Sequence, residues 1–141
     1  MSKRDKITFF IDWSLGQKAI PQALESLNAD VRKHLEHFPP DAPDVEWLAQ
    51  ISELGWVVLT KDKKIATRPL EIRAIASAEV KVFILVSGNL TRLQMADVFA
   101  KSLLKIEKIA VGNKAPFIAK IYKSGKIEVW KNRAQLLKYI K

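Results

Sequence analysis

Short apolar runs separated by polar segments are the main pattern along the chain. Three of them are rich in β-branched and aromatic residues and predict buried strands at 7–11, 56–60 and 80–86. The last run is unbroken, which is typical of a central parallel strand that is covered on both faces. A further strand is predicted at 31–38. Near the end of the chain, a short Gly turn joins two more predicted strands, 117–122 and 126–131, into a hairpin.

Apolar residues at helical spacing lie between these strands. They predict four helices over about 17–28, 44–54, 67–78 and 91–109, and a short fifth helix over about 133–140. Pro21 fits the first helix only within its opening turn. Thr91 is expected to cap the longest helix, whose predicted core-facing residues are Leu93, Ala96, Phe99, Ala100 and Leu103.

The alternation of strands and helices over the first 110 residues predicts an α/β fold. The expected architecture is a three-layer α/β/α sandwich with a mainly parallel central sheet, extended by the C-terminal β-hairpin and short helix. A length of 141 residues fits one domain, here expected to be residues 1–141. Its α/β core would occupy about 7–110, and its hairpin and helix about 115–141.

Charge is distributed unevenly along this fold. The net charge is +9; the first hundred residues hold 13 basic and 13 acidic side chains, whereas residues 101–141 hold 11 basic and two acidic ones. A basic segment of this kind favours a polyanionic partner, with RNA or DNA as the leading candidate and an acidic protein as the alternative. The absence of cysteine excludes disulfides and thiolate chemistry, and it fits a cytoplasmic protein. No stretch approaches the about 18 apolar residues of a membrane-spanning helix.

Three carboxylates stand where the predicted elements begin or end. Asp12 follows the first strand, Asp62 follows the 56–60 strand, and Asp44 opens the helix between them. Because the carboxyl ends of parallel strands form one edge of a sheet, these side chains can converge there. Carboxylate oxygens are ligands for hard cations such as Mg²⁺, which support phosphodiester hydrolysis.

Simpler roles are open for each acid taken alone. Asp44 can serve only as a helix N-cap, and Asp62 only as a turn residue. Asp12 is harder to explain in this way, because it follows an apolar strand directly and enters partly desolvated surroundings.

The order of these acids resembles that of PIN-like domains, in particular the branch of short VapC-type toxins. The resemblance rests on Phe9–Asp12, on the helical Asp44–Ala49, on Val58–Asp62 and on Arg68–Glu71, and it covers about 7–110. It implies a Mg²⁺- or Mn²⁺-dependent ribonuclease with a cognate antitoxin. In this branch the first acid ends a strand, the second begins a helix and the third follows a Leu-Thr-x-Asp strand.

Asp12, Asp44 and Asp62 match the three acids of the resemblance, as catalytic residues and metal ligands. For the fourth acid Glu71 is the better candidate and Asp41 the alternative, whereas Glu46 lies about 200° around the helix from Asp44 and is expected to point away. Arg68 is expected either to bind a phosphate or to form a salt bridge with an acid. Lys61 is a further candidate for contact with the RNA backbone.

The basic C-terminal hairpin supplies the remaining candidates for RNA binding. Its polar face combines Lys120, Tyr122, Lys126 and Trp130, and lysines interleaved with aromatic rings suit single-stranded RNA. The alternative is that Tyr122 and Trp130 pack under the C-terminal helix. His34 and His37 are expected to be surface or edge histidines, because positions three apart on a strand face opposite sides.

Two functions from different classes follow. The leading hypothesis is a metal-dependent endoribonuclease, the toxin of a toxin–antitoxin pair, with an RNA substrate, a cognate antitoxin and, as a further option, a homodimer. The alternative is a non-catalytic nucleic-acid-binding or regulatory module that uses the basic tail. Residues 101–141 can also dock an acidic antitoxin or a second copy of the chain.

Overall fold

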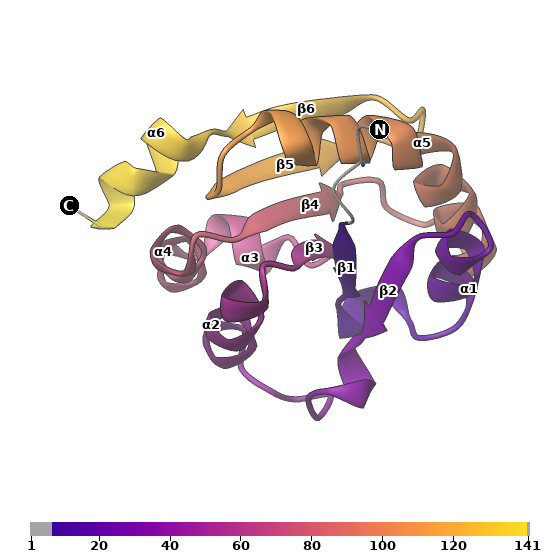
Figure 1. The fold of residues 1–141 in the computed structure, drawn as a ribbon, viewed down its shortest axis with the longest axis horizontal. Coiled ribbons are helices and arrows are strands. Elements are labelled where there is room, and N and C mark those ends of the chain that lie inside the picture. The colour runs from indigo at the N-terminus through magenta and orange to yellow at the C-terminus, as the bar shows by residue number, and fades with distance from the viewer. Residues whose placement is uncertain (1–6, 141) are drawn as a thin grey trace, which may run out of the picture.

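A six-stranded, mostly parallel sheet forms the centre of the molecule (Figure 1). The computed structural model describes residues 7–140, so residues 1–6 and 141 of the predicted domain lie outside the described part. The strand order is β2-β1-β3-β4-β5-β6, and only β6 runs antiparallel to its neighbour. The strands are β1 (Thr8–Ile11), β2 (Asp30–Lys33), β3 (Val57–Thr60), β4 (Lys81–Leu85), β5 (Phe117–Ile121) and β6 (Ile127–Lys131).

Helices cover both faces of this sheet, which confirms the predicted three-layer architecture. The α-helices are α1 (Ala19–Glu25), α2 (Asp44–Leu54), α3 (Lys64–Thr67), α4 (Pro69–Ala78), α5 (Arg92–Gly112) and α6 (Arg133–Leu137). The 3₁₀ turns are η1 (Trp13–Leu15), η2 (His34–Glu36) and η3 (Lys138–Ile140). None of the helices within residues 7–140 combines the length and apolar character that crossing a bilayer requires.

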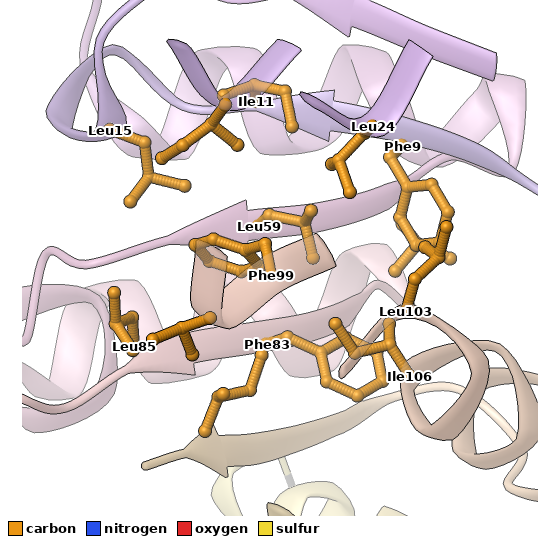
Figure 2. Close-up of a cluster of buried hydrophobic side chains, with 14 of the residues drawn as sticks. Phe9, Ile11, Leu15, Leu24, Leu59, Phe83, Leu85, Phe99, Leu103 and Ile106 are labelled. Atoms are coloured by element: carbon orange, nitrogen blue, oxygen red, sulfur yellow. The ribbon is translucent and has the colours of Figure 1, made fainter. Parts of the chain in front are cut away.

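Strand residues alternate between two hydrophobic cores because successive side chains point to opposite faces. Phe9, Ile11, Leu59 and Phe83 pack with α1 and α5 in the first core, part of which Figure 2 shows. Phe10 and its counterparts on the other strands pack with α2, α3, α4 and α6 in the second core. Burying side chains of this size stabilises the fold by roughly 1.5–3 kcal/mol each. Both faces of the central strands β1, β3 and β4 are therefore buried, as the unbroken apolar run at 80–86 predicts.

Local sequence signals explain several element boundaries. Pro21 lies in the first turn of α1, as predicted, and Pro69 occupies the first turn of α4, where a missing N–H costs no hydrogen bond. Thr91 caps α5. Its side-chain hydroxyl accepts a hydrogen bond from the Gln94 N–H at 3.1 Å, and the Gln94 side-chain oxygen accepts one from the Thr91 N–H.

Two structural predictions are wrong. The strand expected at 31–38 ends at Lys33, because the chain turns into η2 and directs His34 inward. Leu93 is 77% exposed, since the buried face of α5 is centred on Met95, Phe99 and Ile106 instead.

Candidate active site

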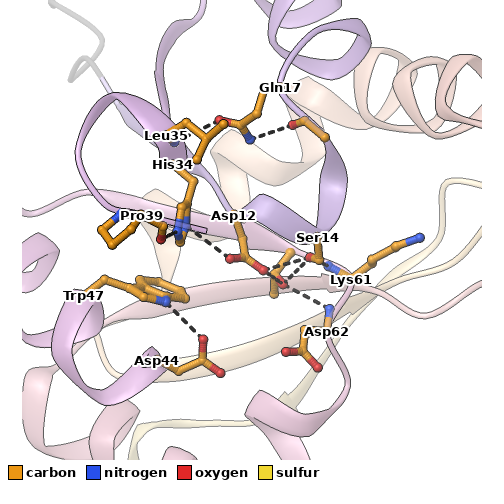
Figure 3. A network of polar contacts seen from close by, with 12 residues as sticks. Asp12, Ser14, Gln17, His34, Leu35, Pro39, Asp44, Trp47, Lys61 and Asp62 are labelled. Carbon is orange, nitrogen blue, oxygen red and sulfur yellow. Dashed lines mark hydrogen bonds and ion pairs between the residues drawn. The ribbon is translucent and has the colours of Figure 1, made fainter. Parts of the chain in front are cut away.

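The carboxyl edge of the sheet brings the predicted acids together. β1 and β3 are neighbours with Ile11 opposite Leu59, so Asp12 and Asp62 emerge side by side from the same edge. Asp44 approaches from the start of α2, and the three carboxylates face one another in Figure 3. A backbone bond from the Asp12 N–H to the Leu59 carbonyl, 3.0 Å long, holds β1 and β3 together beyond the last strand residue. The predicted convergence of these side chains is therefore present.

Asp12 is almost completely buried and is held by several donors. Its Oδ2 accepts hydrogen bonds from the Ser14 and Thr60 hydroxyls, each 2.7 Å long, and its Oδ1 lies 3.5 Å from His34 Nδ1. Burial alone would raise the pKa of Asp12, but its interactions with His34, Thr60 and Ser14 outweigh burial and bring the pKa below its usual value. The surroundings of Asp12 thus favour its ionised form although the side chain is buried.

The sequence analysis did not predict Ser14 and Thr60 as members of this site, and it misplaced His34. The prediction of a surface or edge histidine is wrong, because the side chain is 1% exposed and lies against Phe10, with ring centroids 5.7 Å apart. Its Nε2 is 2.9 Å from the Pro39 carbonyl, which ties the proline loop to Asp12. Burial lowers the pKa of His34, but the bonds to Asp12 and Pro39 raise it above its usual value. His37 is exposed, as expected.

Asp44 is not a helix cap. The N-cap position of α2 is Pro43, and Asp44 is the first helical residue, with its Oδ1 accepting a 3.0 Å bond from Trp47 Nε1. Burial and, after it, the charges of Asp12, Asp62 and Glu71 together raise the pKa of Asp44 to about 6, against the lowering effect of the Trp47 hydrogen bond. The interpretation of Asp44 as only a helix cap is therefore wrong. The charge of every other acid in the cluster raises its pKa.

Glu71 lies in the first turn of α4, where it completes the group of acids around Asp44. Its Oε2 is buried and has no hydrogen-bond partner, which is costly for a carboxylate oxygen. The alternative candidates, Glu46 and Asp41, are both exposed. Glu71 is thus the fourth acid that the geometry favours, and Glu46 faces solvent as its position on the helix predicts.

Lys61 and Arg68 flank Asp62 in the sequence, and within residues 7–140 neither forms an ion pair with the clustered acids. Within residues 7–140, Arg68 forms no salt bridge with any acid of the cluster, so that expectation is wrong, and its side chain is exposed. The Lys61 N–H donates to the Ser14 hydroxyl at 3.2 Å, while its exposed side chain extends away from the carboxylates (Figure 3). Asp62 accepts a 3.0 Å bond from the Lys64 N–H at Oδ1, as a turn residue would.

The donor set fits a hard divalent cation in its chemistry. Within residues 7–140 no group of three or more His, Cys, Asp or Glu side chains is already arranged to hold an ion. The donors are nevertheless oxygens, the buried Glu71 Oε2 is unpartnered, and Asp44 is surrounded by like charges. Mg²⁺ and similar ions bind through one or two carboxylates and keep several waters, so they need no closed cage.

Comparison with known proteins agrees with this geometry. Residues 7–87, more than half of the chain, match the family model of the PIN-like domain. The chain belongs to the PIN-like domain family. It is also 27% identical, over 124 residues, to VapC45 of Mycobacterium tuberculosis, whose name assigns it provisionally as a ribonuclease. That similarity covers 85% of this chain and 89% of VapC45, which confirms the predicted resemblance to the VapC-type branch. No solved structure matches the chain significantly.

The segment that matches the PIN-like family contains all four clustered acids and ends well before the basic hairpin. On that hairpin, Trp130 is half-buried and packs against the second core together with Tyr139 of η3. Tyr122 instead donates its hydroxyl to Glu128 at 2.8 Å, with Lys126 Nζ 6.0 Å from its ring. Packing under the C-terminal helix therefore describes Trp130 but not Tyr122.

Proposed function

We propose that this PIN-like chain is a Mg²⁺- or Mn²⁺-dependent ribonuclease and the toxin of a toxin–antitoxin pair. The observation that carries the proposal is the convergence of Asp12, Asp44 and Asp62 at the carboxyl edge of the sheet, where Asp44 has a pKa of about 6. The similarity to VapC45 supports the ribonuclease activity and the VapC-type biology. The acids are proposed as catalytic residues and metal ligands, with Glu71 as a further ligand.

Each acid has a distinct part in this proposal. Ser14 and Thr60 fix the orientation of Asp12 and keep its carboxylate ionised, while His34 holds its second oxygen. Asp44 and Asp62 each have one oxygen bound to the protein and one that can serve as a ligand. A bound Mg²⁺ or Mn²⁺ would supply Lewis acidity toward a phosphodiester and would make a water molecule a stronger nucleophile.

The RNA strand would be held by the cations around this edge. Lys61 and Arg68 are exposed and form no ion pair with the acids within residues 7–140, so both are available for phosphates. Lys120, Tyr122, Lys126 and Trp130 of the hairpin are proposed to contact the strand further along. We expect the protein to be cytoplasmic, where it would meet its RNA substrate.

The direct test is RNA cleavage by the purified chain in Mg²⁺, in Mn²⁺ and in EDTA. We expect cleavage only with a divalent ion, and we expect Asp62→Asn to lower its rate by at least about 100-fold, because several kcal/mol of transition-state stabilisation would be lost. Asn keeps the acceptor for the Lys64 N–H, so the variant should fold normally.

Glu46→Gln is the matched control, because it removes a carboxylate from the same edge at an exposed position. Its activity should equal that of the unmodified chain. Equal cleavage by the folded Asp62→Asn variant would refute the catalytic proposal and favour a non-catalytic nucleic-acid-binding module.

The toxin role needs its own test, since a ribonuclease need not have an antitoxin. Expression of the chain should arrest growth of a bacterial host, and Asp62→Asn should abolish that arrest. The product of a neighbouring small reading frame should co-purify with the chain and suppress its cleavage of RNA. Unimpaired growth at high levels of active enzyme would contradict the toxin role.

A further inference from the structure

A cavity of about 220 Å³ lies beside the acid cluster, between α3 and the C-terminal hairpin. Lys63, the neighbour of Asp62, lines one side together with Thr67 of α3. Ile84, at the carboxyl end of β4, lines the apolar floor, and Lys120 and Trp130 complete the wall. The cavity therefore opens at the same edge of the sheet as the acids, and only its Lys120 and Trp130 wall lies beyond the PIN-like family match.

The wall of this cavity joins an aromatic ring to positive charges. Lys120 Nζ lies 4.3 Å from the centroid of the Trp130 ring, and Lys131 Nζ lies 4.4 Å from it. Trp130 also packs against the second core, so its ring is held in place before any ligand arrives. Because the ring is already fixed, it loses little conformational freedom when a ligand binds, and this favours affinity.

The two aromatic residues of the hairpin's polar face have different partners. Tyr122 donates its hydroxyl to the Glu128 carboxylate at 2.8 Å. Lys63 and Lys120 line the cavity with Trp130, and Lys131 lies over the same ring. The lysines at the cavity favour a ligand whose anionic groups lie there.

The size of the cavity restricts what can enter it. Sites for drug-sized ligands measure about 300–1,000 Å³, so a smaller cavity suits a single ring system. In RNA, only an unpaired base can turn out of the strand and stack on a protein ring while the phosphates stay outside.

We propose that this cavity binds one unpaired base of the RNA substrate: the base displaces the Lys120 ammonium from the Trp130 ring and stacks on it, while Lys63 and the displaced Lys120 contact the adjacent phosphates. The proposal rests on the proposed ribonuclease function for its choice of ligand. It makes the enzyme specific for single-stranded segments next to the cleaved bond, because a paired base cannot reach the ring.

Binding in EDTA tests this subsite without any cleavage. The probe is a fluorescently labelled single-stranded RNA of about 12 nucleotides, titrated with the full chain; the same RNA in a duplex is the competitor. We expect Trp130→Leu to weaken binding by about ten-fold and Trp130→Phe by much less, because Leu keeps an apolar side chain but has no ring to stack on the base. Lys120→Gln should reduce the slope of log K against log [salt] by about 0.7, the value for one phosphate contact on a single strand.

Lys114→Gln is the control for charge alone, since Lys114 is exposed near the start of β5, at the other end of that strand from Lys120. Its effect on the salt slope should be small. If Trp130→Leu proves unfolded by circular dichroism, the salt slope of Lys120→Gln still decides the question. An unchanged salt slope in Lys120→Gln, or an unchanged RNA affinity in folded Trp130→Leu, would overturn the proposal and leave the cavity for a protein partner.

Failure of the subsite and failure of the proposed function give different results. If the chain cleaves RNA but the cavity variants bind and cleave like the unmodified chain, only the subsite is wrong. If the cavity variants lose affinity in EDTA but no divalent ion supports cleavage, the subsite stands and the ribonuclease proposal is wrong. Preferential binding of the duplex competitor would contradict the subsite directly.

Discussion

Asp12 and Asp44 face the same space but have opposite electrostatic surroundings. We call Asp12, Ser14, His34 and Thr60 the inner half of the site, and Asp44, Asp62 and Glu71 the outer half. In the inner half, hydrogen bonds and a histidine hold the pKa of Asp12 below its usual value despite burial. In the outer half, burial and the neighbouring carboxylates raise the pKa of Asp44 to about 6.

The difference lies in what the protein itself supplies to each half. Two hydroxyls and an imidazole compensate the inner charge, so Asp12 is stable without any ligand. The outer half has a single indole donor for Asp44 and a buried Glu71 oxygen without a partner. Neighbouring like charges repel strongly in partly desolvated surroundings. The outer half is therefore the part of the site that a cation would stabilise.

The largest expected effect is stabilisation by a divalent ion. At a Mn²⁺ concentration of 100 times the Kd, the free energy of unfolding should rise by about 2.7 kcal/mol, because the ion binds only the folded chain. Asp44→Asn and Asp62→Asn should lose most of this gain, measured by urea unfolding with and without Mn²⁺. Glu53→Gln, an exposed acid at the far end of α2, should keep all of it.

An equal Mn²⁺ response in all four chains would show that the ion binds elsewhere. In that case the outer half would be a strained part of the fold and not a cation site.

The second effect compares the same substitution in the two halves. In metal-free buffer at pH 8, Asp12→Asn should destabilise the fold by about 2 kcal/mol, because an amide leaves buried donors without an acceptor. Asp44→Asn should instead be neutral or stabilising, since the amide oxygen still accepts from Trp47 and the repulsion disappears. Urea unfolding of the two variants measures both effects, and equal losses would contradict the distinction between the halves.

Much of this site could be predicted from local patterns. Asp12 and Asp62 follow apolar runs that become β1 and β3, and the pairing of parallel neighbours places them together. Ser14 and Thr60 stand two residues from an acid, a spacing that offered a signal for the hydroxyl contacts. Glu71 was reached through the resemblance, and the packing of α4 brings it close to Asp44.

His34 could not be predicted, because its role depends on contacts distant in the sequence. The apolar residues of 31–38 resemble one strand, but Val31 packs in the first core whereas His34 and Phe38 join the aromatic cluster around Phe10. The apolar pattern of 31–38 indicates that residues are buried, but it does not indicate in which of the two cores each side chain packs. Leu93 shows the converse, because helical spacing alone does not tell which residues of a long helix lie over the sheet.

The smallest effect is the pH dependence that Asp44 imparts to stability. Its folded pKa of about 6 lies above the usual 3.8, so the folded chain holds this proton to a higher pH than the unfolded chain. As the pH rises from about 4 to about 6, the unfolded chain therefore gains relative stability, and the free energy of unfolding falls by about 1 kcal/mol after solvent screening of a half-buried group. The gap between the unmodified chain and Asp44→Asn should open over this interval in metal-free buffer. Any further change of the gap at higher pH comes from His34, because the charge of Asp44 also raises the pKa of His34. A gap that does not vary between pH 4.5 and 8 would show that the charges of the outer half are already compensated within the protein.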